Sequence, residues 1–116
     1  MSYDLAVWDG DRPLDNRQAD STYAELYERY LESDDVLVPP APRIAAYVEA
    51  LVARYPDEND PDFVWSAPPV IDGASGPIVY LAMSYGAAEE VCAYAATLAG
   101  RHGLVCFDPQ DRSLRP

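Results

Sequence analysis

The sequence predicts an α+β domain, because a strand–helix–strand unit near the C-terminus follows two amphipathic helical segments. Segments 77–84 and 104–107 are apolar on both faces, as buried strands are, and they flank a helical pattern over residues 86–102. The chain has 116 residues, of which 49% are hydrophobic, so we expect a single domain over 1–116 with its own core.

The first strand is predicted at residues 3–8, where apolar and polar side chains alternate before the turn signal Asp9-Gly10. A polar loop over 11–20 leads to the first helix, for which Asp20 or Ser21 is the expected N-cap. One face of this helix is apolar and the opposite face is charged. Its apolar stripe consists of Tyr23, Leu26, Tyr27, Tyr30 and Leu31.

The second helix is predicted to begin at Pro42, since a proline in the first helical turn loses no hydrogen bond, and to end at Pro56. Residues 63–76 contain several Pro and Gly breaks together with Trp65, so we expect an irregular surface segment there. The apolar stripe of the second helix consists of Ile44, Tyr47, Val48, Leu51, Val52 and Tyr55.

Ser84 is the expected cap of the third helix, and Arg101-His102-Gly103 predicts its end, because glycine readily adopts the left-handed conformation that follows a helix. With a short edge strand at 113–115, the element order is β-α-α-β-α-β-(β). We expect two layers, in which one small mixed sheet is covered on one face by three helices. The strands 78–83 and 104–107 should be parallel neighbours, joined by a right-handed crossover.

The charge balance indicates what kind of partner the protein has. Twenty acidic residues face eight arginines, with no lysine, which gives a net charge of −12. Such a surface repels nucleic acids and anionic membranes and attracts a basic protein, so we expect a basic protein partner, no nucleic acid and no membrane. The alternative is a protein whose acids serve solubility alone.

No apolar run approaches the ~20 residues that span a bilayer, and no basic leader precedes an apolar stretch, so a cytoplasmic location is expected. Cys92 and Cys106 lie among apolar neighbours and should be buried free thiols. The single histidine, His102, is expected to cap a helix. The acidic loop 57–62 lacks the Gly and Glu positions of an EF-hand, so no metal site is expected.

No segment has the spacing of a catalytic or phosphate-binding motif, so we expect no catalytic residues, no cofactor and no enzymatic activity. Ser84 lacks the flanking glycines of a nucleophile elbow. Asp108 ends a buried strand, where α/β sites often lie, although Asp-Pro is also a common turn. An enzyme whose site combines scattered carboxylates and tyrosines is a third alternative.

The aromatic residues are the strongest candidates for a binding surface. Of nine tyrosines and two tryptophans, most lie on core stripes, but Trp65 and Tyr85 do not. Exposed aromatic side chains among acids are typical of interface hot spots, whereas simple packing is the alternative. The predicted partner-binding residues are Asp57, Glu58, Asp60, Asp62, Trp65 and Tyr85.

Stretches near both ends of the chain are similar to sequences of known proteins. The opening residues 1–8 and the closing stretches Ala88-Glu89-Glu90 and 102–110 resemble small acidic bacterial proteins of largely uncharacterised function, some of which are similar to immunity proteins of polymorphic toxin systems. The resemblance implies a non-catalytic inhibitor that neutralises a basic toxin domain, and it transfers no functional residue. The alternative is an accessory or structural protein without enzymatic activity, which forms a homodimer through a sheet edge.

Overall fold

A computed structural model of the protein describes residues 2–32, 38–56, 64–66 and 69–115. It confirms the α+β class and the predicted order of the main elements. These elements are β1 (Ser2–Trp8), α1 (Asn16–Leu26) with a π-helical turn (Tyr27–Leu31), α2 (Pro42–Arg54), a 3-10 turn (Val70–Gly73), β2 (Ala74–Ser75), β3 (Ile78–Ser84), α3 (Tyr85–Arg101), β4 (Val105–Asp108) and β5 (Ser113–Leu114).

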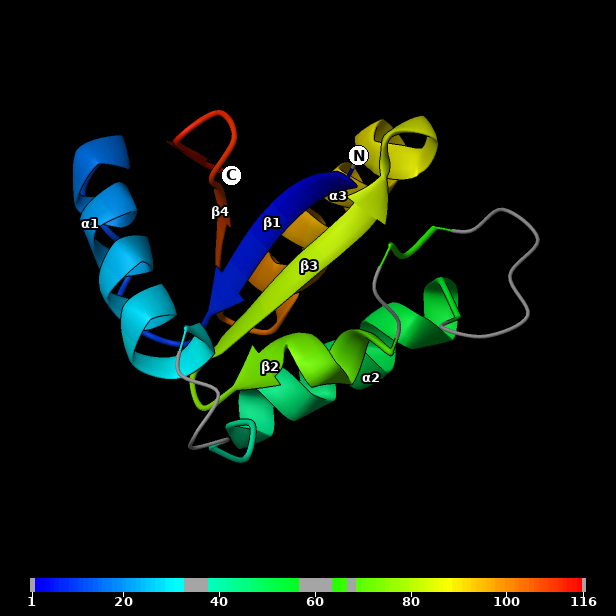
Figure 1. Ribbon diagram of the computed structural model, residues 1–116, viewed down its shortest axis with the longest axis horizontal. Helices are drawn as coiled ribbons and strands as arrows, with labels where there is room; N and C mark the ends of the chain where they lie inside the picture. The colour runs from blue at the N-terminus through cyan, green and yellow to red at the C-terminus, as the bar shows by residue number, and fades with distance from the viewer. Residues whose placement is uncertain (1, 33–37, 57–63, 67–68, 116) are drawn as a thin grey trace.

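The strands form one sheet in the order β2-β3-β1-β4-β5, and every pairing is antiparallel. This corrects the prediction of a mixed sheet in which β3 and β4 are parallel neighbours. The two strands do run in the same direction, but β1 lies between them and pairs with both (Figure 1). The N-terminal strand takes the central place because its side chains are apolar on both faces, with Leu5, Ala6, Val7 and Trp8 all buried.

The helices cover both faces of the sheet, which corrects the prediction of two layers. Leu5 and Val7 point into a core with α2 and α3, whereas Ala6 and Trp8 point into a second core with α1. Figure 1 shows α3 behind β1 and β3, and α1 beside β4. A central strand that is apolar on both sides cannot leave one side in water, so α1 must pack on the face opposite the other two helices.

The first helix starts earlier than predicted, at Asn16, because Asp15 rather than Asp20 or Ser21 is the N-cap. The Asp15 carboxylate accepts a hydrogen bond of 2.8 Å from the backbone N–H of Gln18. The extra turn buries Ala19. The start of α2 at Pro42 is confirmed, and Gly103 follows α3 with φ +70°.

Ser84 occupies the N-cap position of α3 without a side-chain hydrogen bond, and His102 is its C-cap, as predicted. The thiols of Cys92 and Cys106 are free and buried, which confirms that prediction, and burial raises their pKa to about 11 and about 12. Among the helices of the described ranges, none combines the length and the apolar character that a bilayer crossing requires.

Candidate functional site

The predicted partner-binding residues differ in their exposure to solvent, and four of the six lie outside the described residues. Asp57, Glu58, Asp60 and Asp62 lie outside the described residues. Tyr85 is half exposed, with 50% of its surface accessible, at the start of α3. Trp65, in contrast, is only 7% exposed and belongs to the core between the sheet and α2 and α3. The burial of Trp65 favours the packing alternative over the role of a surface anchor.

Trp65 is buried because the segment around it pairs with the edge of β3. Trp65 forms an antiparallel bridge with Met83, and the neighbouring N–H of Ser66 donates to the carbonyl oxygen of Ala82 at 2.9 Å. The pairing turns the indole inward, where its Nε1 donates a 2.7 Å hydrogen bond to the carbonyl oxygen of Tyr55. The tryptophan thus has both an apolar cover and a partner for its polar atom.

Asp108 is 1% exposed and sits at the centre of a polar network at the end of β4. Its Oδ1 accepts two backbone N–H groups, from Gln110 and Asp111, each at 3.1 Å. Its Oδ2 accepts hydrogen bonds from the hydroxyl of Tyr3 and from Nη2 of Arg115, the latter at 3.0 Å. Four donors occupy the carboxylate, so Asp108 has little capacity left to accept a substrate proton or bind a metal, and it serves to hold the C-terminal turn.

A hollow of about 350 Å³ lies next to this network, and half-exposed Tyr85 stands in its wall. The hydrogen bond from Tyr3 to Asp108, followed by burial, raises the pKa of Tyr3 to about 12, so the phenol stays protonated as a donor. The ring of Tyr85 meets that of Tyr3 edge-on, with centroids 6.0 Å apart. The hollow is lined by Tyr3, Tyr85, Ala88, Glu89, Cys92 and Arg115.

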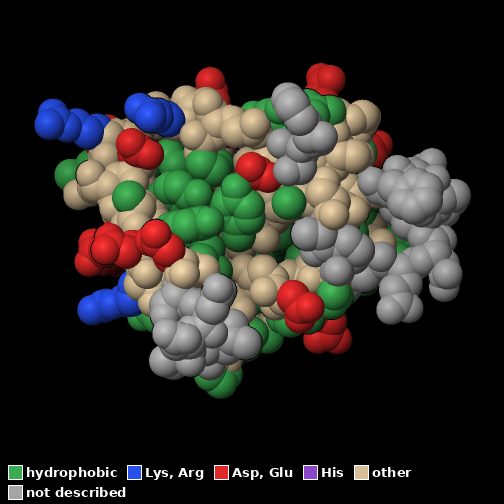
Figure 2. Space-filling model, in the orientation of Figure 1, with side chains coloured by type: hydrophobic (Ala, Val, Ile, Leu, Met, Phe, Trp, Pro, Cys, Tyr) green, Lys and Arg blue, Asp and Glu red, His purple; other side chains and the backbone are tan. Residues whose placement is uncertain are grey.

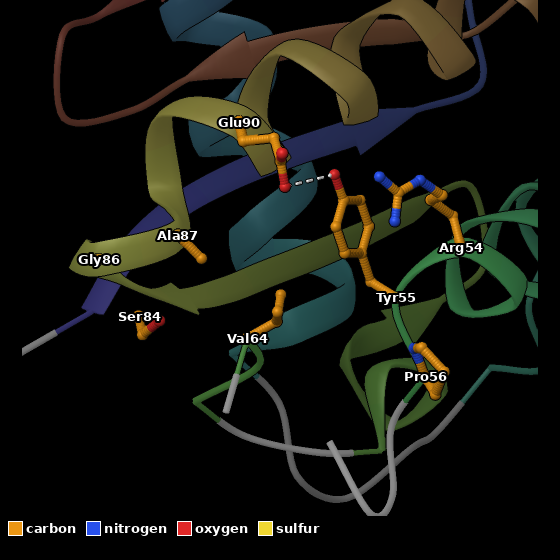
Figure 3. A pocket seen from close by; sticks show the side chains of 8 residues that line it. All are labelled: Arg54, Tyr55, Pro56, Val64, Ser84, Gly86, Ala87 and Glu90. Atoms are coloured by element: carbon orange, nitrogen blue, oxygen red, sulfur yellow. Dashed lines mark hydrogen bonds between the residues drawn. The ribbon is translucent and has the colours of Figure 1, made fainter. Parts of the chain in front are cut away.

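A wider hollow of about 640 Å³ opens where the end of α2 meets the start of α3 (Figure 3). In Figure 3, Tyr55 and Glu90 point toward each other, and the hydroxyl of Tyr55 donates to Glu90 Oε2 at 3.1 Å. The Arg54 guanidinium lies over the Tyr55 ring, 4.5 Å from its centroid. The charged groups of this wall are thus engaged with Tyr55. The hollow is lined by Arg54, Tyr55, Pro56, Val64, Ser84, Gly86, Ala87 and Glu90.

The third candidate is an aromatic surface between α1 and the sheet, which we call the tyrosine face. It consists of Tyr23 and Tyr27 from α1 and its π-helical turn, Tyr80 from β3, and the acids Asp4 and Asp20 beside them. Figure 2 shows apolar side chains gathered in a hollow on this side of the molecule, with acidic side chains on either side of them.

The sheet register explains how the three rings meet. Ala6 of β1 pairs with Tyr80 on one side and Phe107 on the other, and its small side chain leaves room for rings above the strand. Tyr27 packs edge-on against Tyr80, with ring centroids 5.9 Å apart, and the ring centroids of Tyr23 and Tyr27 are 5.8 Å apart. Tyr27 keeps 38% of its surface exposed. The face is therefore a preformed, partly solvent-accessible aromatic surface.

Acids dominate the electrostatics of the tyrosine face. Burial is the largest cause that raises the pKa of Tyr23 to about 12. The nearby Tyr27, Asp4 and Asp20 add to this shift. Burial also raises the pKa of Tyr80, followed by its hydrogen bond to Asp4. The face thus presents neutral phenols among carboxylates, which favours a cationic group above the rings.

Sequence patterns missed the tyrosine face because its residues fit core stripes. Tyr23 and Tyr27 belong to the apolar stripe of the first helix, and Tyr80 to a strand that reads as buried. The helix, however, packs mainly over β4 and β5, at the side of the sheet away from β3 (Figure 1). One margin of the stripe therefore stays open above β1.

Comparisons of the chain with protein families, with curated proteins and with solved structures find no match.

The raised pKa values of Tyr3 and Tyr23 predict that the domain unfolds at alkaline pH. Tyrosines ionise near pH 10 in an unfolded chain, whereas Tyr3 and Tyr23 have a pKa of about 12 in the fold. Their contribution to stability is therefore complete below pH ~10 and is lost as the pH rises from ~10 to ~12, where unfolding releases protons. We expect the ring resonances of Tyr3 and Tyr23 in NMR spectra to report their ionisation in this window, together with the loss of helical circular dichroism. Ionisation of Tyr3 or Tyr23 near pH ~10 with an unchanged fold would contradict the packing described for these two rings.

Proposed function

We propose that this domain is a non-catalytic inhibitor of the immunity type, which binds and neutralises a basic protein in the cytoplasm. The observation that carries the proposal is the tyrosine face, an aromatic surface among carboxylates on a chain with a net charge of −12. Long-range attraction between opposite charges speeds encounter, while buried aromatic contacts slow dissociation. An inhibitor that must intercept a toxin quickly and hold it needs both properties.

The other two sites support the proposal less well. The carboxylate of Asp108 is occupied by four donors, and in the 640 Å³ hollow Arg54 and Glu90 both contact Tyr55. With the residues that the structure describes, neither of these sites presents an exposed ring among several carboxylates, as the tyrosine face does with Tyr27.

The sheet topology gives little support to the alternative, a homodimer that forms through a sheet edge. The outer strands β2 and β5 have two residues each, Ala74–Ser75 and Ser113–Leu114. Such short edges offer few backbone groups to a neighbouring strand.

The test is capture of a partner, followed by kinetics. Immobilised domain should retain a basic protein from an extract of the source cells at low ionic strength. With the purified partner, the association rate should fall steeply as salt rises, while the dissociation rate changes little. Expressed alone, that partner should arrest growth, and co-expression of this chain should relieve the arrest. Retention of neutral or acidic proteins only, or a partner without toxicity, would refute the proposal.

Paired charge variants separate local attraction from net charge. Asp4→Asn with Asp20→Asn removes two charges at the tyrosine face, whereas Glu49→Gln with Asp72→Asn removes two exposed charges elsewhere, on α2 and the 3-10 turn. We expect the first pair to slow association by roughly three- to tenfold and the second by much less.

A further inference from the structure

The described residues contain three edge-on tyrosine pairs, Tyr3–Tyr85, Tyr27–Tyr80 and Tyr55–Tyr94, and the last of these already holds a cation. Tyr55 and Tyr94 meet at 80° with centroids 5.6 Å apart, and the Arg54 guanidinium lies 4.5 Å from the first ring and 5.9 Å from the second. Tyr27 and Tyr80 meet in the same way, at 71° and 5.9 Å. The Tyr55–Tyr94 pair shows that an arginine fits against such an aromatic corner in this fold.

The tyrosine face has the same aromatic corner without a cation from the chain. All eight arginines fall within the described ranges, and among those ranges the cation–π contacts involve Arg54 alone. The groups that shift the pKa of Tyr23 and Tyr80 electrostatically are carboxylates and other phenols. In the described part of the chain, no arginine lies over the ring of Tyr27 or Tyr80.

A guanidinium suits this corner better than an ammonium group does. It is planar and weakly hydrated, so it can stack on a tyrosine ring while its N–H groups bond to carboxylates at the ring's margin. An ammonium is a compact, strongly hydrated charge that gives up more hydration energy when it leaves water. Asp4 and Asp20 raise the pKa of Tyr23, and Asp4 is hydrogen-bonded to Tyr80, so carboxylates lie near these rings as further acceptors for such N–H groups.

We propose that the tyrosine face binds an arginine side chain of the basic partner, stacked at Tyr27 and Tyr80 and paired with the flanking carboxylates. The inference rests on the proposed function and names the chemistry by which the partner is recognised. Charge complementarity favours this occupant, because the face is acidic and the chain has a net charge of −12.

A defined peptide tests the inference without the natural partner. The probe is a capped Gly-Arg-Gly-Arg-Gly peptide, titrated into isotopically labelled domain at low ionic strength, with lysine and citrulline versions as comparisons. We expect amide shifts around Tyr23, Tyr27 and Tyr80, affinity about threefold or more weaker for the lysine peptide, and no binding of neutral citrulline. Equal binding of the arginine and lysine peptides, no shifts at all, or shifts centred elsewhere would overturn the proposal.

Matched variants locate the ring that matters. Tyr27→Ala should weaken arginine-peptide binding by about three- to tenfold, whereas Tyr27→Phe, which keeps the ring, should leave it nearly unchanged. Tyr85→Ala removes another exposed tyrosine, at the start of α3, and should have no effect. Circular dichroism checks that each variant is folded. An equal loss with Tyr85→Ala would contradict the assignment.

The two proposals can fail separately. A captured basic partner that binds Tyr27→Ala as tightly as the wild type would overturn the arginine site and leave the inhibitor function intact. Binding of the arginine peptide at the tyrosine face, without any basic partner in the extract, would overturn the inhibitor function alone.

Discussion

Replacing Trp65 by alanine is expected to lower the free energy of unfolding by about 3–5 kcal/mol, in the range found for large aromatic truncations in protein cores. The side chain is 7% exposed and packs edge-on against Tyr55, with ring centroids 6.5 Å apart. Its removal leaves a cavity and also removes the donor for the carbonyl oxygen of Tyr55. Urea denaturation followed by circular dichroism measures the change.

Trp65→Phe is the matched control. It keeps an aromatic ring in the core but loses the 2.7 Å hydrogen bond from Nε1, so we expect a smaller loss, about 1–3 kcal/mol. If Trp65→Ala instead leaves the free energy of unfolding within about 0.5 kcal/mol of the wild type, the indole does not contribute to the core, and its role as a surface anchor would regain support.

The sequence predicted elements well where local pattern and burial agree. The stripe of α2 is a case in point, because Ile44, Tyr47, Val48 and Leu51 recur at helical spacing and are all buried. Pro42 at the helix start and Gly103 after α3 were also recognisable, since each is suited to its place by backbone geometry alone.

The sheet order and the layers were not predictable from local pattern. We interpreted the first strand as alternating and hence half-exposed, yet residues 5–8 are all apolar, and Leu5 and Val7 face one core while Ala6 and Trp8 face another. Which strand occupies the centre depends on pairings between residues far apart in sequence, such as Ala6 with Phe107. The preference for helix-linked strands to be neighbours is a tendency, and here the N-terminal strand lies between them.

The candidate sites were missed for the same reason. Tyr80 of β3 and Tyr27 of the π-helical turn are far apart in sequence and meet only in the folded chain. Trp65 lies in a stretch rich in Pro and Gly, which predicts a surface segment, but its pairing with Met83 turns the indole inward. In each case the deciding contact is tertiary, and the residue types on their own fit both a core and a surface.

The network at Asp108 is the other place where a single change should have a large effect. Asp108→Asn leaves Arg115 without its carboxylate, and it places an amide NH₂ where the wild-type carboxylate accepts only donors. Breaking a fully buried ion pair costs about 3–5 kcal/mol, but the Arg115 side chain is 32% exposed and can regain water. We therefore expect Asp108→Asn to lower the free energy of unfolding by about 2–4 kcal/mol, measured by urea denaturation.

Neighbouring variants show whether this loss comes from the buried carboxylate. Asp111→Asn changes an exposed acid of the same turn and should cost at most about 0.5 kcal/mol. Tyr3→Phe removes one of the four donors and should cost about 1 kcal/mol, because the other three still satisfy the carboxylate. Since Asp108 joins the first strand to the last through Tyr3 and Arg115, its loss should also expose β5 to proteolysis before the rest of the domain unfolds. Equal stability of Asp108→Asn and Asp111→Asn would show that the network does not hold the C-terminal strand.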